Sequence, residues 1–237
     1  MNATRDNLDP RELAKFEALA EEWWDLTGPF RTLHEINPLR LDYVKARATL
    51  AGAKVLDVGC GGGLFSEALA AEGADVVGLD RSPTSLDAAR RHAEAGGVSL
   101  RYIEEDVAVH AEHHPAAYDI VTCMELLEHV PDPEALVAAC SRLVRPGGTV
   151  FFSTICRSLK SFLLAIVAAE HLLKLVPKGT HEYAKLIRPS ELAAWCRACG
   201  LTVRDLSGLR FDPFTRAHRI GGTPDMNYLC HADRPRQ

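Results

Sequence analysis

The stretch Lys54-Val-Leu-Asp-Val-Gly-Cys-Gly-Gly-Gly63 decides the fold of this chain of 237 residues. Its first half is a short apolar run that favours a β-strand, and its second half is a cluster of glycines that favours a tight turn. The segment that follows, residues 64–72, has the apolar spacing of a helix. A glycine-rich turn between a strand and a helix is typical of the first βαβ unit of a doubly wound sheet.

Strand and helix signals alternate along the rest of the chain. Apolar runs predict strands at residues 75–80, 98–103, 118–124, 149–154, 201–209 and 227–231. Helical patterns predict helices at residues 10–26, 38–50, 83–95, 133–144 and 189–199. This order predicts an α/β fold with a doubly wound, mostly parallel seven-stranded sheet, in which one of the last two strands returns antiparallel. We expect one domain over residues 1–237, with an N-terminal helical cap at 1–50 and a helical insertion at 156–188 after the fifth strand.

The composition excludes several classes of protein. Hydrophobic residues make up 47% of the chain and charged residues 25%, which is ordinary for a globular protein and unlike a disordered or coiled-coil chain. The net charge is −5 and there is no basic run, so we expect no nucleic-acid partner. The seven cysteines are scattered in apolar runs, which favours a reducing compartment and burial in the core. With no signal-peptide pattern and no spanning run in the sequence, we expect a cytoplasmic protein.

The glycine turn has a carboxylate partner. Asp80 follows Gly63 by 17 residues, at the end of the next predicted strand, where an acid can accept hydrogen bonds from ribose hydroxyls. A dinucleotide fingerprint would need glycine at position 64, which is leucine, so a nucleotide-binding oxidoreductase is disfavoured. The Lys-Ser/Thr pair of a phosphate-binding loop is also missing from this turn. What remains is a Gly-x-Gly-x-Gly turn that begins at Gly59 and is preceded by Asp57.

This turn resembles motif I of the class I S-adenosylmethionine (SAM) methyltransferases. Residues 118–124 resemble the fourth strand of that family, and Pro146-Gly-Gly148 resembles the turn before its fifth strand. The resemblance implies that SAM is the cofactor and that Asp80 holds its ribose. It also implies that Asp106, just after the third strand, lies near the adenine amino group. The cofactor-binding residues expected on this basis are Arg40, Asp57, Gly59, Cys60, Gly61, Asp80, Asp106 and Met124.

Longer motifs extend the resemblance over nearly the whole chain. In order they are Trp23-Trp-Asp25, His34-Glu-Ile-Asn-Pro-Leu-Arg40, Met124-Glu-Leu-Leu-Glu-His-Val-Pro-Asp-Pro133, Pro177-Lys-Gly-Thr-His181 and Met226-Asn-Tyr228. Together they look like the O-methyltransferases of ubiquinone biosynthesis. The resemblance implies O-methylation of catechol or phenol hydroxyls on polyprenylated ubiquinone precursors, including demethylubiquinol, with other enzymes of that pathway as partners. The alternatives are a methyltransferase for another quinone or aromatic small molecule, and a SAM-binding protein without catalysis.

Arg40 and the tryptophan pair are expected to lie beside the cofactor. Arg40 corresponds to the arginine that the family places near SAM, and its guanidinium can fork onto the methionine carboxylate. The alternative is a surface arginine on a helix. Trp23 and Trp24 can only donate hydrogen bonds, so we expect them to pack against the site or cover it rather than react.

Glu125, Glu128 and His129 follow the fourth predicted strand at positions i, i+3 and i+4. On a helix these side chains share one face, and we expect them to be the catalytic group. Two carboxylates and an imidazole can hold one Mg²⁺ or similar divalent cation and leave positions open for the oxygens of a catechol. The alternatives are that His129 acts alone as a general base or that the cluster is structural. Lys178 and His181 are a second, weaker candidate for lining the acceptor pocket, and a solvated loop is the alternative there.

Residues 158–178 have a helical pattern with their charges on one stripe. The apolar surface is larger than one core-facing stripe requires. Such a helix either packs against the sheet or in a dimer, or lies in a membrane surface, where a polyprenylated quinol resides. It is too short and too charged at its C-terminal end to span a bilayer. We therefore expect reversible, peripheral membrane association through this segment.

Overall fold

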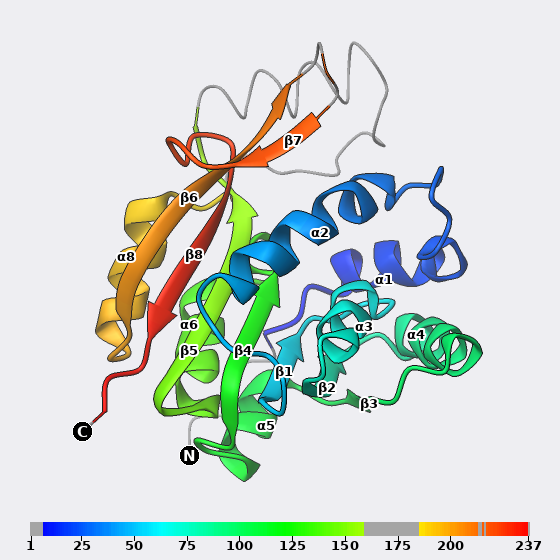
Figure 1. Cartoon of the computed structure of the whole chain (residues 1–237), viewed down its shortest axis with the longest axis horizontal. Coiled ribbons are helices and arrows are strands. Elements are labelled where there is room, and N and C mark those ends of the chain that lie inside the picture. Colours follow the sequence, from blue (N-terminus) through cyan, green and yellow to red (C-terminus); the bar gives the residue numbers. More distant parts are fainter. Residues whose placement is uncertain (1–6, 159–184, 213–214, 216, 237) are drawn as a thin grey trace.

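Eight strands form one sheet in the computed structural model, which describes residues 7–158, 185–212, 215 and 217–236. The strands are β1 (Lys54–Val58), β2 (Asp75–Asp80), β3 (Arg101–Glu104), β4 (Tyr118–Met124), β5 (Val144–Ile155), β6 (Thr202–Asp212), β7 (Ala217–Ile220) and β8 (Asn227–Asp233). Their order across the sheet is β3-β2-β1-β4-β5-β8-β6-β7 (Figure 1). The first five strands pair in parallel, and β8 runs antiparallel to both β5 and β6. The predicted doubly wound, mostly parallel sheet is confirmed.

The strand count differs from the prediction of seven by one. The additional strand is β7, which pairs antiparallel with the end of β6 at the edge of the sheet. Its sequence, Ala-His-Arg-Ile, has no apolar run. Three of its four residues are half-buried, and the fourth, Arg219, is exposed. Edge strands are often short and charged, and this makes them hard to detect from hydrophobicity.

Helices cover both faces of the sheet (Figure 1). On one face α2 (Arg31–Lys45) and α3 (Leu64–Ala71) pack on a core that includes Val55, Val76, Ile120, Phe151 and Leu229. On the other face α5 (Val107–His113), α6 (Pro133–Leu143) and α8 (Pro189–Ala198) pack on a core that includes Leu56, Val77, Val121, Phe152 and Cys230. Neighbouring residues of each strand thus enter opposite cores, which explains why the predicted strands were apolar throughout. The remaining long helix, α4 (Pro83–Gly96), contacts β2 and β3.

The N-terminal region differs from the predicted helices. The single helix expected over 10–26 is α1 (Pro10–Ala18) followed by a short 3₁₀ helix, η1 (Ala20–Glu22). The helix expected at 38–50 begins earlier, because α2 continues through Pro38. α5 was not predicted, and its first turn is capped by the Asp106 carboxylate. Proline after a capping side chain, Asp9 or Ser82, therefore marked true helix starts at α1 and α4, whereas Pro38 alone misplaced the start of α2.

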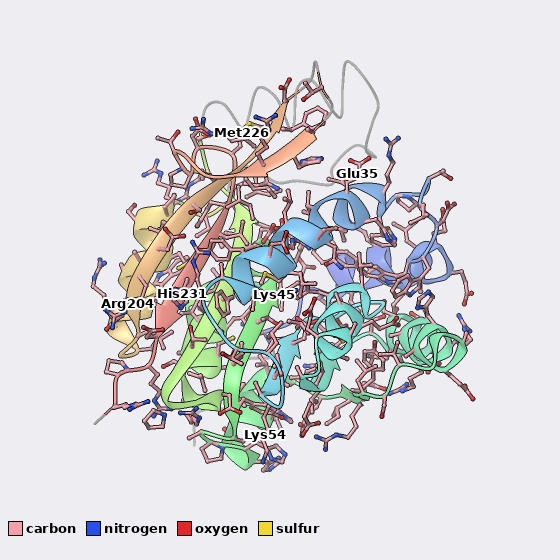
Figure 2. All side chains as sticks on the ribbon, in the orientation of Figure 1. Glu35, Lys45, Lys54, Arg204, Met226 and His231 are labelled. Carbon is pink, nitrogen blue, oxygen red and sulfur yellow. The ribbon has the colours of Figure 1, made fainter. Side chains whose placement is uncertain are left out.

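The parallel strands begin on one side of the molecule and end on the opposite side. Lys54 begins β1 at the amino ends of these strands, and Met226 lies at their carboxyl ends, beside the start of β8 (Figure 2). Because the first residue of β8 pairs with the last residue of β5, Met226 marks the edge where the parallel strands end. Ligands of open α/β sheets bind at this carboxyl edge.

The predicted insertion is described only at its ends, residues 156–158 and 185–188. Lys178, His181 and nearly all of segment 158–178 lie outside the described residues. Within the described ranges, no helix is long and apolar enough to cross a membrane. All seven cysteines carry free thiols, six of them buried and Cys199 partly buried, so the predicted burial of these residues in the core is confirmed.

Candidate active site

The glycine turn lies between β1 and α3, at the carboxyl edge of the sheet. Gly59, Gly61 and Gly63 have left-handed backbones, with φ angles of 70°, 52° and 84°. Residues with a side chain rarely adopt this conformation, so the alternation of glycines follows from the shape of the turn. The backbone N–H groups of Gly59 and Cys60 donate to the carbonyl of Leu79, at 2.7 and 3.1 Å. The turn is therefore tied to the end of the neighbouring strand.

The tryptophan pair packs directly on the glycine turn. A side chain added at Gly61 or Gly62 would collide with the ring of Trp23, so these glycines make room for an indole. Trp23 donates from Nε1 to Ser85 Oγ at 3.2 Å, and its ring stacks on Phe30 with centroids 3.8 Å apart. Trp24 donates from Nε1 to the carbonyl of Gly62 at 3.0 Å. The N-terminal region thus covers the turn from outside.

Two carboxylates hold the turn from the strand side. Asp57 is buried and accepts hydrogen bonds from Ser66 Oγ and Thr122 Oγ1, both at 2.7 Å. Burial raises the pKa of Asp57 to about 6, against the effect of these hydrogen bonds. Asp80 accepts from the backbone N–H groups of Gly61 and Ser82, both at 2.8 Å, and burial raises its pKa. Each carboxylate oxygen of Asp80 has a further lone pair, so the residue can still accept hydrogen bonds from a ligand.

The other expected cofactor residues have different surroundings. The Cys60 side chain is buried, and burial raises the pKa of its thiol well above the ordinary value. Met124 ends β4 and is buried. Asp106 caps α5 by accepting from Ala108 N at 2.8 Å, and its other oxygen lies 2.9 Å from Arg81 Nη1. A structural role therefore already engages both oxygens of Asp106.

Arg40 is the unusual group of the site. Its side chain comes from α2 and is only 4% exposed, although it is charged. Nη2 lies 2.9 Å from Glu125 Oε1, but this ion pair lacks hydrogen-bond geometry. Within the described part of the chain, the buried atoms Nε and Nη2 have no hydrogen-bond acceptor. Nε thus has no acceptor among those residues and Nη2 has only the poorly aligned carboxylate of Glu125, so this edge of the Arg40 guanidinium can hold the carboxylate of a cofactor.

The turn after β4 is not an α-helix, so the condition on which Glu125, Glu128 and His129 would share one face is not met. Glu125 has a left-handed backbone with φ of 52°, and a 3₁₀ turn, η2 (Leu127–His129), follows it. The three side chains therefore do not share one helical face. Glu125 lies against Arg40, and Glu128 accepts from Thr154 Oγ1 at 2.7 Å. A non-glycine residue in this strained backbone region is a frequent feature of functional sites.

His129 has a partner that the sequence did not reveal. Its Nδ1 lies 2.8 Å from Oε2 of Glu12, a buried residue of α1. Lys15 Nζ lies 2.7 Å from the other Glu12 oxygen. Glu12 was overlooked because it lies in a strongly charged segment. The signal that could have identified it is an acid on the side of the helix that also carries Phe16, four residues later.

The ionisable groups of this turn shift one another's pKa values. Burial first, and then the charge of Glu125, raises the pKa of Glu128 to about 7. Burial lowers the pKa of His129, but the hydrogen bond to Glu12 and the charges of Glu128, Glu12 and Glu125 outweigh it and raise the pKa. The hydrogen bond from His129 lowers the pKa of Glu12 to about 2. The turn thus holds one carboxyl group with a pKa of about 7, Glu128, beside a histidine whose pKa is raised.

The same turn does not form a ready metal site. No three His, Cys, Asp or Glu side chains in the described part of the chain come together to hold an ion. Glu125, Glu128 and His129 instead contact Arg40, Thr154 and Glu12, respectively. Their donor atoms suit a divalent cation, but their arrangement does not suit it without an exchange of partners.

Comparisons with known proteins decide the family. A family model described as a methyltransferase domain matches residues 31–206. The ubiquinone biosynthesis O-methyltransferase of Aromatoleum aromaticum is 54% identical to this chain over 226 residues, which cover 95% of this chain and 97% of the relative. That of Pectobacterium carotovorum is 53% identical over 226 residues, 95% of each chain. This chain belongs to the ubiquinone biosynthesis O-methyltransferase family.

Solved structures support the fold of this O-methyltransferase family member. A magnesium protoporphyrin IX methyltransferase from Synechocystis, solved with bound SAM, superposes with a TM-score of 0.64 at 18% identity, over 98% of this chain and 100% of that one. A SAM-dependent methyltransferase from Thermotoga maritima gives a TM-score of 0.65 at 15% identity, over 94% and 99% of the two chains. At identities this low, the superpositions show a shared fold and nothing further. The predicted fold and the predicted family are both confirmed.

Proposed function

We propose that this chain transfers the methyl group of SAM to a phenolic hydroxyl of polyprenylated ubiquinone precursors, including demethylubiquinol. The observation that carries the proposal is the meeting of two groups at the carboxyl edge of the sheet. One is the glycine turn with the Arg40 guanidinium, whose Nε has no acceptor among the described residues, and the other is the turn that contains Glu128 and His129. The names of the relatives supply the substrate class, a precursor of ubiquinone.

The cofactor would lie along the glycine turn. Bound SAM supplies an electrophilic methyl group on a positively charged sulfur. Nε and Nη2 of Arg40 would donate to its carboxylate, and Asp80 would accept from its ribose hydroxyls. Met124 ends the adjacent strand and would line the same site. A contact between Asp106 and the adenine stays a prediction, since this carboxylate already caps a helix.

The acceptor would lie against the turn after β4. A phenol has a pKa of about 10, so its oxygen is a poor nucleophile until the proton is removed. His129 is the base we assign, because its Nδ1 is engaged by Glu12 and its Nε2 can accept a proton. Glu128, with a pKa of about 7, adds negative charge beside the resulting imidazolium. Transfer also requires the acceptor oxygen about 3 Å behind the methyl carbon, in line with sulfur.

The divalent cation expected from the sequence stays a prediction. Glu125, Glu128 and His129 would hold it only after Arg40 and Glu12 release two of them. Such an ion would favour the ionised catechol. Full turnover in excess EDTA, with no metal retained by the protein, would leave the base alone. Loss of turnover that Mg²⁺ restores would establish the ion.

The membrane contact also stays a proposal. A polyprenyl tail resides in the bilayer, so the enzyme must meet its substrate at that surface. Segment 158–178 carries the apolar sequence that would make the contact. We expect the chain to float with anionic liposomes, less so in high salt, and the double substitution Phe162→Glu and Ile166→Glu to abolish flotation. If the double variant unfolds, or the parent never floats, the segment serves the protein interior instead.

The decisive experiment for the proposed function is a methyl-transfer assay. Purified protein would be incubated with isotope-labelled SAM and a panel of acceptors, including a short-chain demethylubiquinol, a simple catechol and an unrelated quinol. We expect label in the methyl ether of the demethylubiquinol at the highest kcat/KM. Preferential labelling of a different quinol would replace the acceptor. SAM binding without labelling of any acceptor would contradict the assignment as an enzyme.

A further inference from the structure

The N-terminal helix brings one side chain into the active site. Glu12 is the buried residue of α1, with an exposed fraction of 7%, whereas its helical neighbours are partly or fully exposed. Its Oε2 accepts from Nδ1 of His129 at 2.8 Å, a contact between residues 117 positions apart. Its Oε1 lies 2.7 Å from Lys15 Nζ and 3.9 Å from Lys185 Nζ. Each oxygen of Glu12 therefore has a separate partner, and one of them is reserved for the imidazole.

The same N-terminal segment fixes the turn around His129. The side-chain amide of Asn7 donates to the carbonyl of Asp132 at 2.8 Å, and its oxygen accepts from the N–H of Asp132 at 2.7 Å. The ring of Phe16 meets the His129 imidazole edge-on, at 87° and 5.2 Å between centroids. The imidazole is therefore held by a hydrogen bond and by a packing contact, both from residues that precede the glycine turn in sequence.

This arrangement leaves Nε2 of His129 as the nitrogen that is available to a substrate. A carboxylate accepts hydrogen bonds and donates none, so Nδ1 must carry the proton in the contact with Glu12. In the neutral ring Nε2 is then the lone-pair nitrogen, and among the residues that the structure describes none hydrogen-bonds to it. A carboxylate that fixes the tautomer and orientation of a histidine is a recurrent device of general-base catalysis.

We propose that Glu12 is a positioning residue of the methyl-transfer reaction, acting through His129. The proposal rests on the proposed function. Nε2 of His129 takes the phenolic proton, the oxygen electron pair forms the bond to the methyl carbon, and the pair of the broken carbon–sulfur bond stays on sulfur. The products are the methyl ether, the demethylated cofactor and an imidazolium paired with Glu12. The N-terminal helix is in this way part of the catalytic apparatus and not only a cover.

A purely structural contact is the competing explanation. Glu12 and His129 would then only anchor α1 to the turn, and their loss would lower stability without a specific effect on turnover. The two explanations differ in kcat: a structural contact predicts an unchanged kcat in a folded variant, whereas a positioning role predicts a lower kcat at an unchanged KM. The tautomer of His129 tests the contact with Glu12 on which the positioning role depends.

The test compares Glu12→Gln with Glu12→Asp and with Glu17→Gln, which makes the same chemical change on the same helix. Glu17 is partly exposed and has no hydrogen bond or ion pair from its side chain to another described residue. With labelled SAM and a short-chain demethylubiquinol, we expect kcat of Glu12→Gln to fall about 10- to 1,000-fold, with KM values within about twofold. Glu12→Asp should recover part of the loss, and Glu17→Gln should match the parent. A kcat of Glu12→Gln within twofold of the parent would overturn the proposal.

A spectroscopic measurement covers the case in which Glu12→Gln does not fold. In ¹⁵N-histidine NMR spectra of the parent, assigned by comparison with His129→Gln, we expect the His129 signal to show a protonated Nδ1 and an unprotonated Nε2 at a pH where the ring is neutral. The opposite tautomer would overturn the proposal. If the parent shows the expected tautomer but methylates no phenol, the proposed function fails while the placement of Glu12 stands. The two failures are thus distinguishable.

Discussion

The glycine turn at residues 59–63 and the acidic turn at residues 125–129 follow neighbouring strands, yet they are held in different ways. The glycine turn is fixed by its own backbone and by the next strand, through the carbonyl of Leu79. The acidic turn is fixed by side chains that arrive from distant parts of the chain, namely Glu12 and Arg40. We therefore expect the glycine turn to keep its shape when the cofactor binds, and the acidic turn to change its side-chain contacts when the acceptor binds beside it.

The largest expected effect separates the two turns by function. His129→Ala should lower kcat by about 10²- to 10⁴-fold, the usual contribution of a general base. The affinity for SAM should stay within about twofold, because His129 acts on the acceptor. Steady-state kinetics and calorimetry measure the two quantities. His114→Ala is the control, since His114 lines a cavity together with Lys54 and Asp75, the residues that begin β1 and β2 at the other end of the parallel strands.

A parallel loss of SAM affinity in His129→Ala would contradict the separate functions of the two turns. It would mean that the acidic turn also holds the cofactor. In that case the ion pair between Arg40 and Glu125 would be the connection to investigate, because it is the direct contact between the expected cofactor residues and the acidic turn.

Sequence reasoning succeeded where the structure is local. The strand, the glycine turn and Asp80 follow one another within 27 residues, and each imposes its own backbone preference. It failed at the acidic turn because spacing of three and four implied a helix, whereas Glu125 adopts a left-handed backbone that hydrogen bonds to Ser153 help to hold. It could not find Glu12, since its burial depends on a tertiary contact with His129.

The next effect concerns the glycine turn itself. Asp80→Ala should weaken SAM binding by about 1–3 kcal/mol, because it removes charge-assisted hydrogen bonds to the ribose. The kcat at saturating SAM should change little. Asp80 also accepts from Gly61 and Ser82, so Asp80→Asn, which keeps the side-chain size and one acceptor oxygen, is the matched variant. Unchanged affinity of both variants in calorimetry would remove Asp80 from the ribose site.

Gly62 belongs to the glycine turn but is packed against Trp23, a side chain from the N-terminal region. A side chain there would collide with the ring of Trp23, although the backbone of Gly62 is not left-handed. We expect Gly62→Ala to lower the free energy of unfolding by about 1–3 kcal/mol through overpacking. Trp23→Leu should restore part of that loss in the double variant. Gly96→Ala is the control, because the added methyl would meet only ordinary contact distances, and equal losses in urea unfolding would contradict the argument.

The smallest expected effect is the pH dependence of stability. The pKa of Glu12 falls from 4.5 to about 2 on folding, so its contribution is present above pH 4.5 and is lost as the pH falls toward 2. The pKa of His129 rises above 6.5 on folding, so its contribution is present below pH 6.5 and is lost as the pH rises through the folded value. The pair should therefore stabilise the protein most between about pH 4.5 and 6.5.

Glu12→Gln tests this window. Urea unfolding of the parent and of the variant from pH 3 to 9 should show a difference of about 1–2 kcal/mol inside the window and a smaller one on either side, since protonation of Glu12 below the window and loss of the His129 proton above it each remove one of the two charges. The glycine turn should behave with the opposite sign. The pKa of Asp57 rises from 3.8 to about 6 because it is buried, so its protonation favours folding at low pH and its contribution is lost between those values. A difference between parent and Glu12→Gln that is flat across the whole range would mean that Glu12 and His129 are not ion-paired in solution, and the contrast between the two turns would then be one of packing and not of charge.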